Sequence, residues 1–202
     1  MAFSKFYECL CTVSKTVSLS FAALNNIDRK NYLIQEGIKG WQELSYYVRD
    51  LGFDYLIFEP MSVPREMAYS IEETLTLMDC VNQNSGVPMR ICLDVGHAPH
   101  PDQRDPYPWI DRHGALSPVV HLQQTVLNKS NHWPFTSEYN EQGIIKPKKV
   151  IDALKKSGAK EALLAFEISH REHMDSDYRI IEELKTSVDY WKPFIAAAEA
   201  ER

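Results

Sequence analysis

The sequence lacks the features of membrane, secreted and nucleic-acid-binding proteins. None of its apolar runs approaches the about 20 residues that a membrane helix needs. Near the N-terminus, the apolar residues are interrupted by Glu8, Ser14 and Lys15, which is unlike a signal peptide. The 22 lysines and arginines are outnumbered by 28 aspartates and glutamates, and they form no basic stripe for a polyanion. We therefore expect a cytoplasmic protein with no membrane and no nucleic acid partner.

Cysteine pairs and nucleotide motifs are also missing. The four cysteines form no C-x-x-C pair, which is typical of reduced thiols in a cytosolic protein. We interpret Cys9 and Cys11 as small apolar residues in or near a strand, with a metal or redox pair as the alternative. No G-x-G-x-x-G, P-loop or G-x-S-x-G motif indicates a nucleotide site or a serine hydrolase.

What is present is an alternation of apolar runs and helical patterns. Strands are expected at 16–24, 53–60, 88–94, 118–122 and 161–167, and helices at 31–52, 70–86, around Trp109, at 146–158 and at 175–194. Ser70 and Glu73 have the spacing of a capping box, and residues 123–145 are expected to form a long loop. Near-continuous apolar strands separated by helices indicate a parallel sheet covered on both faces. We predict one α/β domain over residues 1–202.

Four of these strands carry a polar residue at or near their C-terminal end. They are Glu59, Asp94, His121 and Glu167. Parallel α/β sheets place ligand sites at this edge, and three carboxylates there would repel one another unless a cation joined them. Three oxygen donors and one imidazole suit Mn²⁺, Mg²⁺ or Co²⁺ better than Zn²⁺. Taken singly, each acid could instead cap a helix or pair with an arginine, and His121 could be a buried structural histidine.

Further histidines follow the same strand ends. His97 comes three residues after Asp94, and we expect it to bind a substrate oxygen rather than the metal. Four more histidines lie in loops after strand ends, where the alternative is that they are exposed and without a role: His100, His132, His170 and His173.

The segments that carry these residues resemble a known group of enzymes. "LIFEP", "LDVGH", "VVHLQQ" and "LAFEISH" are similar to the motifs of the xylose isomerase-like barrel proteins, the sugar phosphate isomerase/epimerase superfamily. The resemblance implies that Glu59, Asp94, His121 and Glu167 hold one divalent metal ion and that Glu59 and Glu167 also act as acid and base. "FEPMSVPREM", "HLQQT", "HWPFT" and "EISHRE" further resemble the tetrulose-phosphate epimerase branch, the D-erythrulose 1-phosphate 3-epimerase type.

The expected barrel is incomplete. A (β/α)₈ barrel has eight strands in typically about 250 residues, whereas this sequence predicts five strands in 202 residues. The resemblance covers roughly residues 17–195 and assigns them to about five C-terminal βα units of a TIM (β/α)₈-type barrel. A truncated gene model, a fragment and a naturally shortened form are all consistent with this count.

The expected reaction is proton transfer at the carbon beside a ketose carbonyl, through a metal-stabilised enediolate. Glu59 and Glu167 would act on opposite faces of that carbon and invert it. His97 would hold an oxygen near the carbonyl. If the sugar carries a phosphate, its expected donors are Gln123, Lys129, His132 and Arg171, with ordinary surface-loop residues as the alternative.

Four alternatives stay open at this point. They are an aldose–ketose isomerase, an epimerase of non-phosphorylated ketoses, a metal-dependent endonuclease of the same superfamily, and a non-catalytic barrel fragment. A homo-oligomer is also open, because five parallel strands leave unpaired edges.

Overall fold

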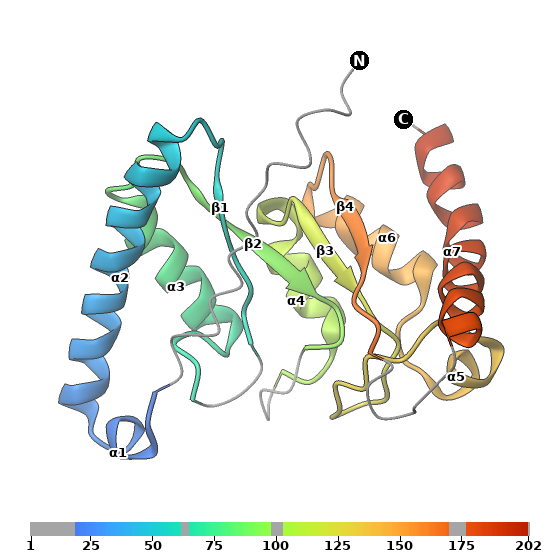
Figure 1. Cartoon of the computed structure of the whole chain (residues 1–202), viewed down its shortest axis with the longest axis horizontal. Helices are drawn as coiled ribbons and strands as arrows, with labels where there is room; N and C mark the ends of the chain where they lie inside the picture. The colour runs from blue at the N-terminus through green and yellow to red at the C-terminus, as the bar shows by residue number, and fades with distance from the viewer. Residues whose placement is uncertain (1–18, 62–64, 98–102, 170–176, 202) are drawn as a thin grey trace. The chain divides into compact units, whose positions relative to one another are not determined.

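The computed structural model describes residues 19–61, 65–97, 103–169 and 177–201 (Figure 1). The chain divides into two compact units, Met1–Cys92 and Leu93–Arg202. In chain order the elements are α1 (Phe21–Leu24), α2 (Ile27–Asp50), β1 (Leu56–Phe58), α3 (Ile71–Asn82), β2 (Met89–Asp94), α4 (Pro106–His113), the 3₁₀ helix η2 (Gly114–Leu116), β3 (Val119–Leu122), α5 (Ser137–Gln142), α6 (Pro147–Ser157), β4 (Leu163–Phe166) and α7 (Asp177–Ala200).

The first unit packs helices on a pair of parallel strands. β1 pairs parallel with β2, and Phe58 lies opposite Ile91. All three β1 residues are buried, and the Trp41 ring of α2 meets Phe58 edge-on at 6.1 Å between centroids. The Ser70 side chain accepts a hydrogen bond from the Glu73 N–H at the start of α3, so the predicted N-terminal cap is confirmed. This register places Glu59 directly after β1.

One predicted strand, 16–24, is wrong over its described part. Residues 16–18 lie outside the described residues, and Phe21–Leu24 form the short helix α1. The Ser20 side chain caps this helix by accepting from the Ala23 N–H, and Phe21 is 67% exposed, unlike a buried strand residue. The described residues therefore contain four strands rather than five.

The second unit contains the C-terminal end of β2 and the whole of β3 and β4. β3 pairs parallel with β4, and His121 lies opposite Ala165. α6 ends at Gly158, which has the left-handed φ of 87°. α7 packs through Trp191, which is buried and meets Phe135 edge-on at 5.2 Å. The predicted loop 123–145 is partly wrong, because it contains α5, although the rest of it has no further helix.

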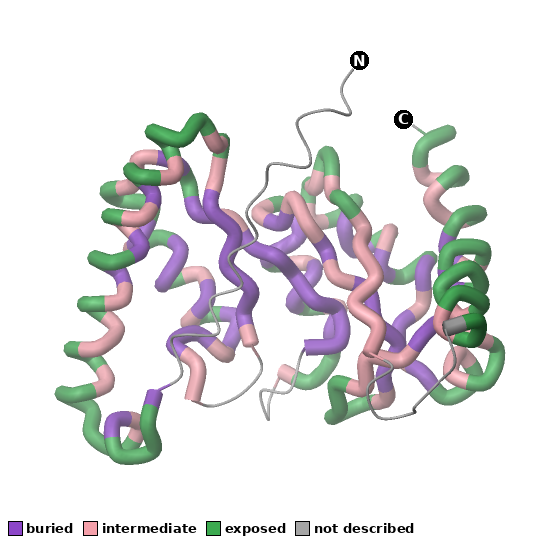
Figure 2. Tube along the Cα trace, viewed as in Figure 1, coloured by how far each residue is buried: buried purple, intermediate pink, exposed green. Residues whose placement is uncertain are grey.

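The strand β2 and the helix α7 differ in how far their residues are buried. Figure 2 shows β2 buried along nearly its whole length, whereas α7 is largely exposed along the helix. β4 is less buried than β2, and Leu163 at its start is 49% exposed. Among the described residues, no helix combines the length and apolar character required to cross a membrane.

Candidate metal centre

The strand pairing of the second unit brings three polar side chains to one edge. The Val95 N–H donates to the His121 carbonyl at 3.1 Å, which places the end of β2 beside β3. The Glu167 N–H donates to the Leu122 carbonyl at 3.0 Å, which extends the β3–β4 pairing by one residue. As a result, ligand atoms of Asp94, His121 and Glu167 lie within 4.8 Å of one another. The structure thus brings together the three strand-end residues of the second unit that the sequence singled out.

Asp94 is the most buried of them, at 3% exposed. Its Oδ1 accepts the Gly96 N–H at 2.6 Å, and Gln123 Nε2 donates to both carboxylate oxygens at 3.0 and 3.1 Å. Burial raises the pKa of Asp94 to about 7, helped by the nearby Glu167 and opposed by His97 and Gln123. Without a cation, this carboxylate is therefore costly to ionise.

Glu167 has the opposite tendency. His121 Nδ1 lies 3.0 Å from its Oε2, and this hydrogen bond is the main reason why the pKa of Glu167 is lowered to about 2. The Glu167 side chain is 41% exposed and the His121 side chain 17%. Glu167 thus stays ionised and accessible, whereas Asp94 is enclosed.

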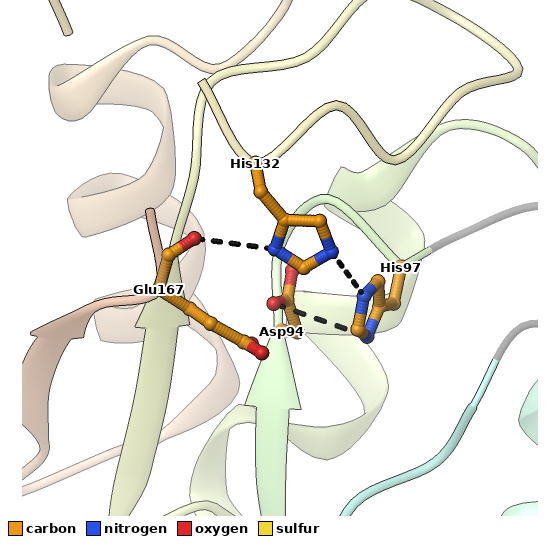
Figure 3. Close-up of side chains that lie close together, drawn as sticks. All are labelled: Asp94, His97, His132 and Glu167. Atoms are coloured by element: carbon orange, nitrogen blue, oxygen red, sulfur yellow. Dashed lines mark hydrogen bonds and ion pairs between the residues drawn. The ribbon is translucent and has the colours of Figure 1, made fainter. Parts of the chain in front are cut away.

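Two further imidazoles, those of His97 and His132, lie beside Asp94 and Glu167. His132 has a positive φ of 51°, and its Nε2 lies 3.4 Å from His97 Nε2 (Figure 3). His132 Nδ1 lies 3.2 Å from the Glu167 carbonyl oxygen. Because a carbonyl only accepts, Nδ1 carries the proton, and in the neutral ring Nε2 keeps its lone pair. This lone pair points toward His97, whose Nδ1 lies 3.8 Å from Asp94 Oδ2.

The residues fit a divalent metal ion. Asp94, His97, His132 and Glu167 each offer one ligand atom, all within 4.8 Å of one another, and His121 joins Asp94 and Glu167 in the same way. Carboxylate oxygens with imidazole nitrogens suit Mn²⁺, Co²⁺ or Zn²⁺. A cation here would offset the cost of burying the Asp94 charge.

The remaining predicted site residues lie in several places. Glu59 is 7% exposed in the first unit, with a carboxylate oxygen within 4.8 Å of Cys92 Sγ; its ligand role stays a prediction. Gln123 is fully buried and bonded to Asp94. Lys129 is exposed on the loop after β3. Arg171 lies outside the described residues, as do His100, His170 and His173.

Two residues near the centre were not predicted. Ser130 Oγ lies 3.1 Å from His132 Nε2 and also contacts the Gln123 amide. Gly96 packs against Gln123 so closely that a Cβ would lie 2.3 Å from Gln123 Cδ. The only sequence feature that could have indicated Gly96 is its position between Asp94 and His97. Nothing in the sequence indicated Ser130.

Two known proteins are similar to this chain over most of its length. No protein-family model matches the sequence. The chain is 32% identical over 191 residues to the D-erythrulose 1-phosphate 3-epimerase of Brucella abortus, covering 90% of this chain and 62% of the relative. A putative xylose isomerase from Rhodospirillum rubrum superposes with a TM-score of 0.75 at 23% identity, over 87% of this chain and 59% of that one.

The chain has the fold of the xylose isomerase-like barrel proteins. The predicted resemblance is therefore confirmed, and the described residues form part of such a barrel, with four parallel-sheet strands. The chain spans 62% of the length of its epimerase relative.

Proposed function

We propose that this chain is the catalytic part of a metal-dependent epimerase that acts on a tetrulose phosphate such as erythrulose 1-phosphate. The observation that carries the proposal is the convergence of Asp94, His121 and Glu167 at the ends of β2, β3 and β4. The likeness to an erythrulose-phosphate epimerase over most of the chain supports the choice of substrate.

Asp94, His121 and Glu167 would hold the ion, with Glu59 as the fourth ligand. When bound, a divalent ion supplies positive charge beside the substrate carbonyl and so stabilises negative charge that develops there. Asp94 is enclosed at 3% exposed, and it suits a ligand rather than a group that meets a substrate carbon. His121 orients Glu167 through the 3.0 Å hydrogen bond.

Glu167 and Glu59 are the proposed proton-transfer pair. The Glu167 carboxylate is ionised, because its pKa is lowered to about 2, and it is 41% exposed, so it carries no proton and is open to a substrate. We assign to it the removal of the proton from the carbon beside the carbonyl. Glu59, protonated at the start, would give its proton to the opposite face of that carbon, and Glu167 would keep the proton that it removed. The two glutamates exchange roles in the reverse direction, and no redox cofactor is needed.

His97 and His132 are proposed to bind substrate oxygens. The Nδ1 proton of His132 is held by the Glu167 carbonyl, which leaves Nε2 as an acceptor for a sugar hydroxyl. Lys129 and Arg171 are the proposed partners of the phosphate, because they are basic residues that follow β3 and β4 in the sequence.

Deuterium exchange tests the proposal. Manganese-loaded protein in D₂O should incorporate one deuterium at C3 of D-erythrulose 1-phosphate and invert that centre, as read by mass spectrometry and NMR. The surface variant Asp152→Asn is the matched control and should retain exchange, since Asp152 contacts Lys148 in α6. A product with a moved carbonyl would favour an isomerase, and no exchange by the loaded protein would contradict the proposal.

A further inference from the structure

Two adjacent glutamines after β3, Gln123 and Gln124, are both fully buried. In each, the amide nitrogen donates hydrogen bonds and the amide oxygen accepts them. Gln123 Nε2 donates to the Asp94 carboxylate and to Ser130 Oγ, and its Oε1 accepts the His132 N–H at 2.7 Å. Gln124 Nε2 donates to Asn140 Oδ1 and to the Ile145 carbonyl. The two side chains therefore serve different parts of the second unit.

The orientation of the Gln123 amide is fixed by its neighbours. If the amide were turned over, its NH₂ would face the His132 N–H and its carbonyl oxygen would face the Asp94 carboxylate. Both new contacts would be repulsive, because two donors and two acceptors would meet. Gln123 is thus a donor toward Asp94 and an acceptor from the His132 loop in the same arrangement.

This arrangement selects one oxygen of Asp94. Oδ1 accepts from the Gly96 N–H at 2.6 Å and from Gln123 at 3.0 Å, which uses both of its lone pairs. Oδ2 shares the Gln123 N–H at 3.1 Å and faces His97 Nδ1 at 3.8 Å. Oδ2 is therefore the oxygen with capacity left for a cation.

We propose that Gln123 is a positioning residue that presents Asp94 Oδ2 to a divalent cation and holds the backbone of His132 beside it, rather than a residue that touches substrate. The inference rests on the metal-dependent function proposed above and revises the contact to substrate that the sequence suggested for Gln123. Its full burial, its hydrogen bonds to Asp94, Ser130 and His132, and its fixed amide leave no group to meet a sugar.

Gly96 gives this role an independent observation. A Cβ on Gly96 would lie 2.3 Å from Gln123 Cδ and 2.7 Å from its Oε1, and Gly96 does not have a positive φ. Glycine is therefore required at this position by the close approach of Gln123 and not by the backbone conformation. A methyl group here would push the amide away from Asp94.

The test is the Mn²⁺ affinity of Gln123→Met, measured at one pH from the EPR signal of free Mn²⁺, beside Gln124→Met. Methionine keeps the length of the side chain and removes its hydrogen bonds. Gln124 is the matched control, because it is equally buried, equally bonded and packed against Gly143. We expect Gln123→Met to weaken Mn²⁺ binding about 10–100-fold, as is usual when a partner of a metal ligand is lost. Gln124→Met should lower the melting temperature of the metal-free protein and leave Mn²⁺ affinity unchanged.

Gly96→Ala provides a second route if Gln123→Met does not fold, and it should weaken Mn²⁺ binding in the same way. The EPR spectrum of the bound Mn²⁺ should change in Gly96→Ala and Gln123→Met but not in Gln124→Met. Wild-type affinity in Gln123→Met, an equal loss in both glutamine variants, or a wild-type chain that binds no Mn²⁺ would overturn the inference. The expected Mn²⁺ results without any epimerisation would instead contradict the proposed function alone.

Discussion

His121 and Glu167, 46 residues apart, are joined by a hydrogen bond of 3.0 Å between Nδ1 and Oε2. The pair links the end of β3 to the end of β4, and both residues lie beside the buried Asp94. An imidazole and two carboxylates held in this way by the sheet would need little backbone movement to bind the cation that we propose.

Metal binding should stabilise the folded chain. At a free Mn²⁺ concentration 100 times its Kd, binding to the folded state alone contributes about 2.7 kcal/mol, or roughly 5–10 °C in Tm for a chain of this size. Asp94→Asn should lose this shift and still melt cooperatively without metal, because the substitution removes a buried charge. Calorimetry with and without Mn²⁺ checks this, and an equal shift in Asp94→Asn would place the ion elsewhere.

The Asp94 carboxyl should titrate far from its usual range. In the metal-free protein, we expect the ¹³Cγ resonance of Asp94 to change with a midpoint near pH 7, since burial raises its pKa to about 7 from 3.8. Because the folded chain then binds this proton more tightly than the unfolded chain, the contribution of Asp94 to stability is fully present below about pH 4. It is lost as the pH rises toward 7. A midpoint near pH 4 would show that Asp94 is solvated.

The two proposed proton-transfer groups should both be needed for exchange. Glu167→Gln and Glu59→Gln, each assayed at saturating Mn²⁺, should slow deuterium exchange at C3 by about 10²–10⁴-fold, the usual contribution of a general acid or base. The rates follow from mass spectrometry of the substrate over time. Wild-type exchange in Glu59→Gln would remove that residue from the mechanism.

Two glycines outside the candidate centre should respond in opposite ways to alanine. Gly158 ends α6 at a φ of 87°, so Gly158→Ala should cost about 1–2 kcal/mol of folding free energy. Gly40 lies on the exposed side of α2 with no atom within 4 Å of an added Cβ, so Gly40→Ala should stabilise by about 1 kcal/mol. Urea denaturation measures both changes, and the same sign for both would contradict either the helical position of Gly40 or the left-handed end of α6 at Gly158.

Much of the centre could be predicted from sequence, because strands of one parallel sheet end at one edge. Asp94, His121 and Glu167 each follow or end an apolar run, and that pattern alone brings them together. The strand predicted at 16–24 is wrong over its described residues, since its apolar pattern suggested a strand while Ser20 caps a helix.

The contacts of the loop after β3 could not be predicted in the same way. His132 reaches Glu167 through a left-handed backbone conformation, and the loop is closed by the bridge between Gln124 and Trp133. Such contacts depend on tertiary packing of the loop and leave no periodic pattern in the sequence. The fixed amide of Gln123 depends on the same packing.

The amount of Mn²⁺ bound by the purified chain tests the central claim most directly. Equilibrium dialysis of the wild type beside His121→Ala and Glu167→Gln separates a built centre from surface binding. The account predicts about one tightly bound ion per wild-type chain and loss of that ion in both variants. A folded wild-type chain that binds no ion, or variants that bind as much as the wild type, would contradict it.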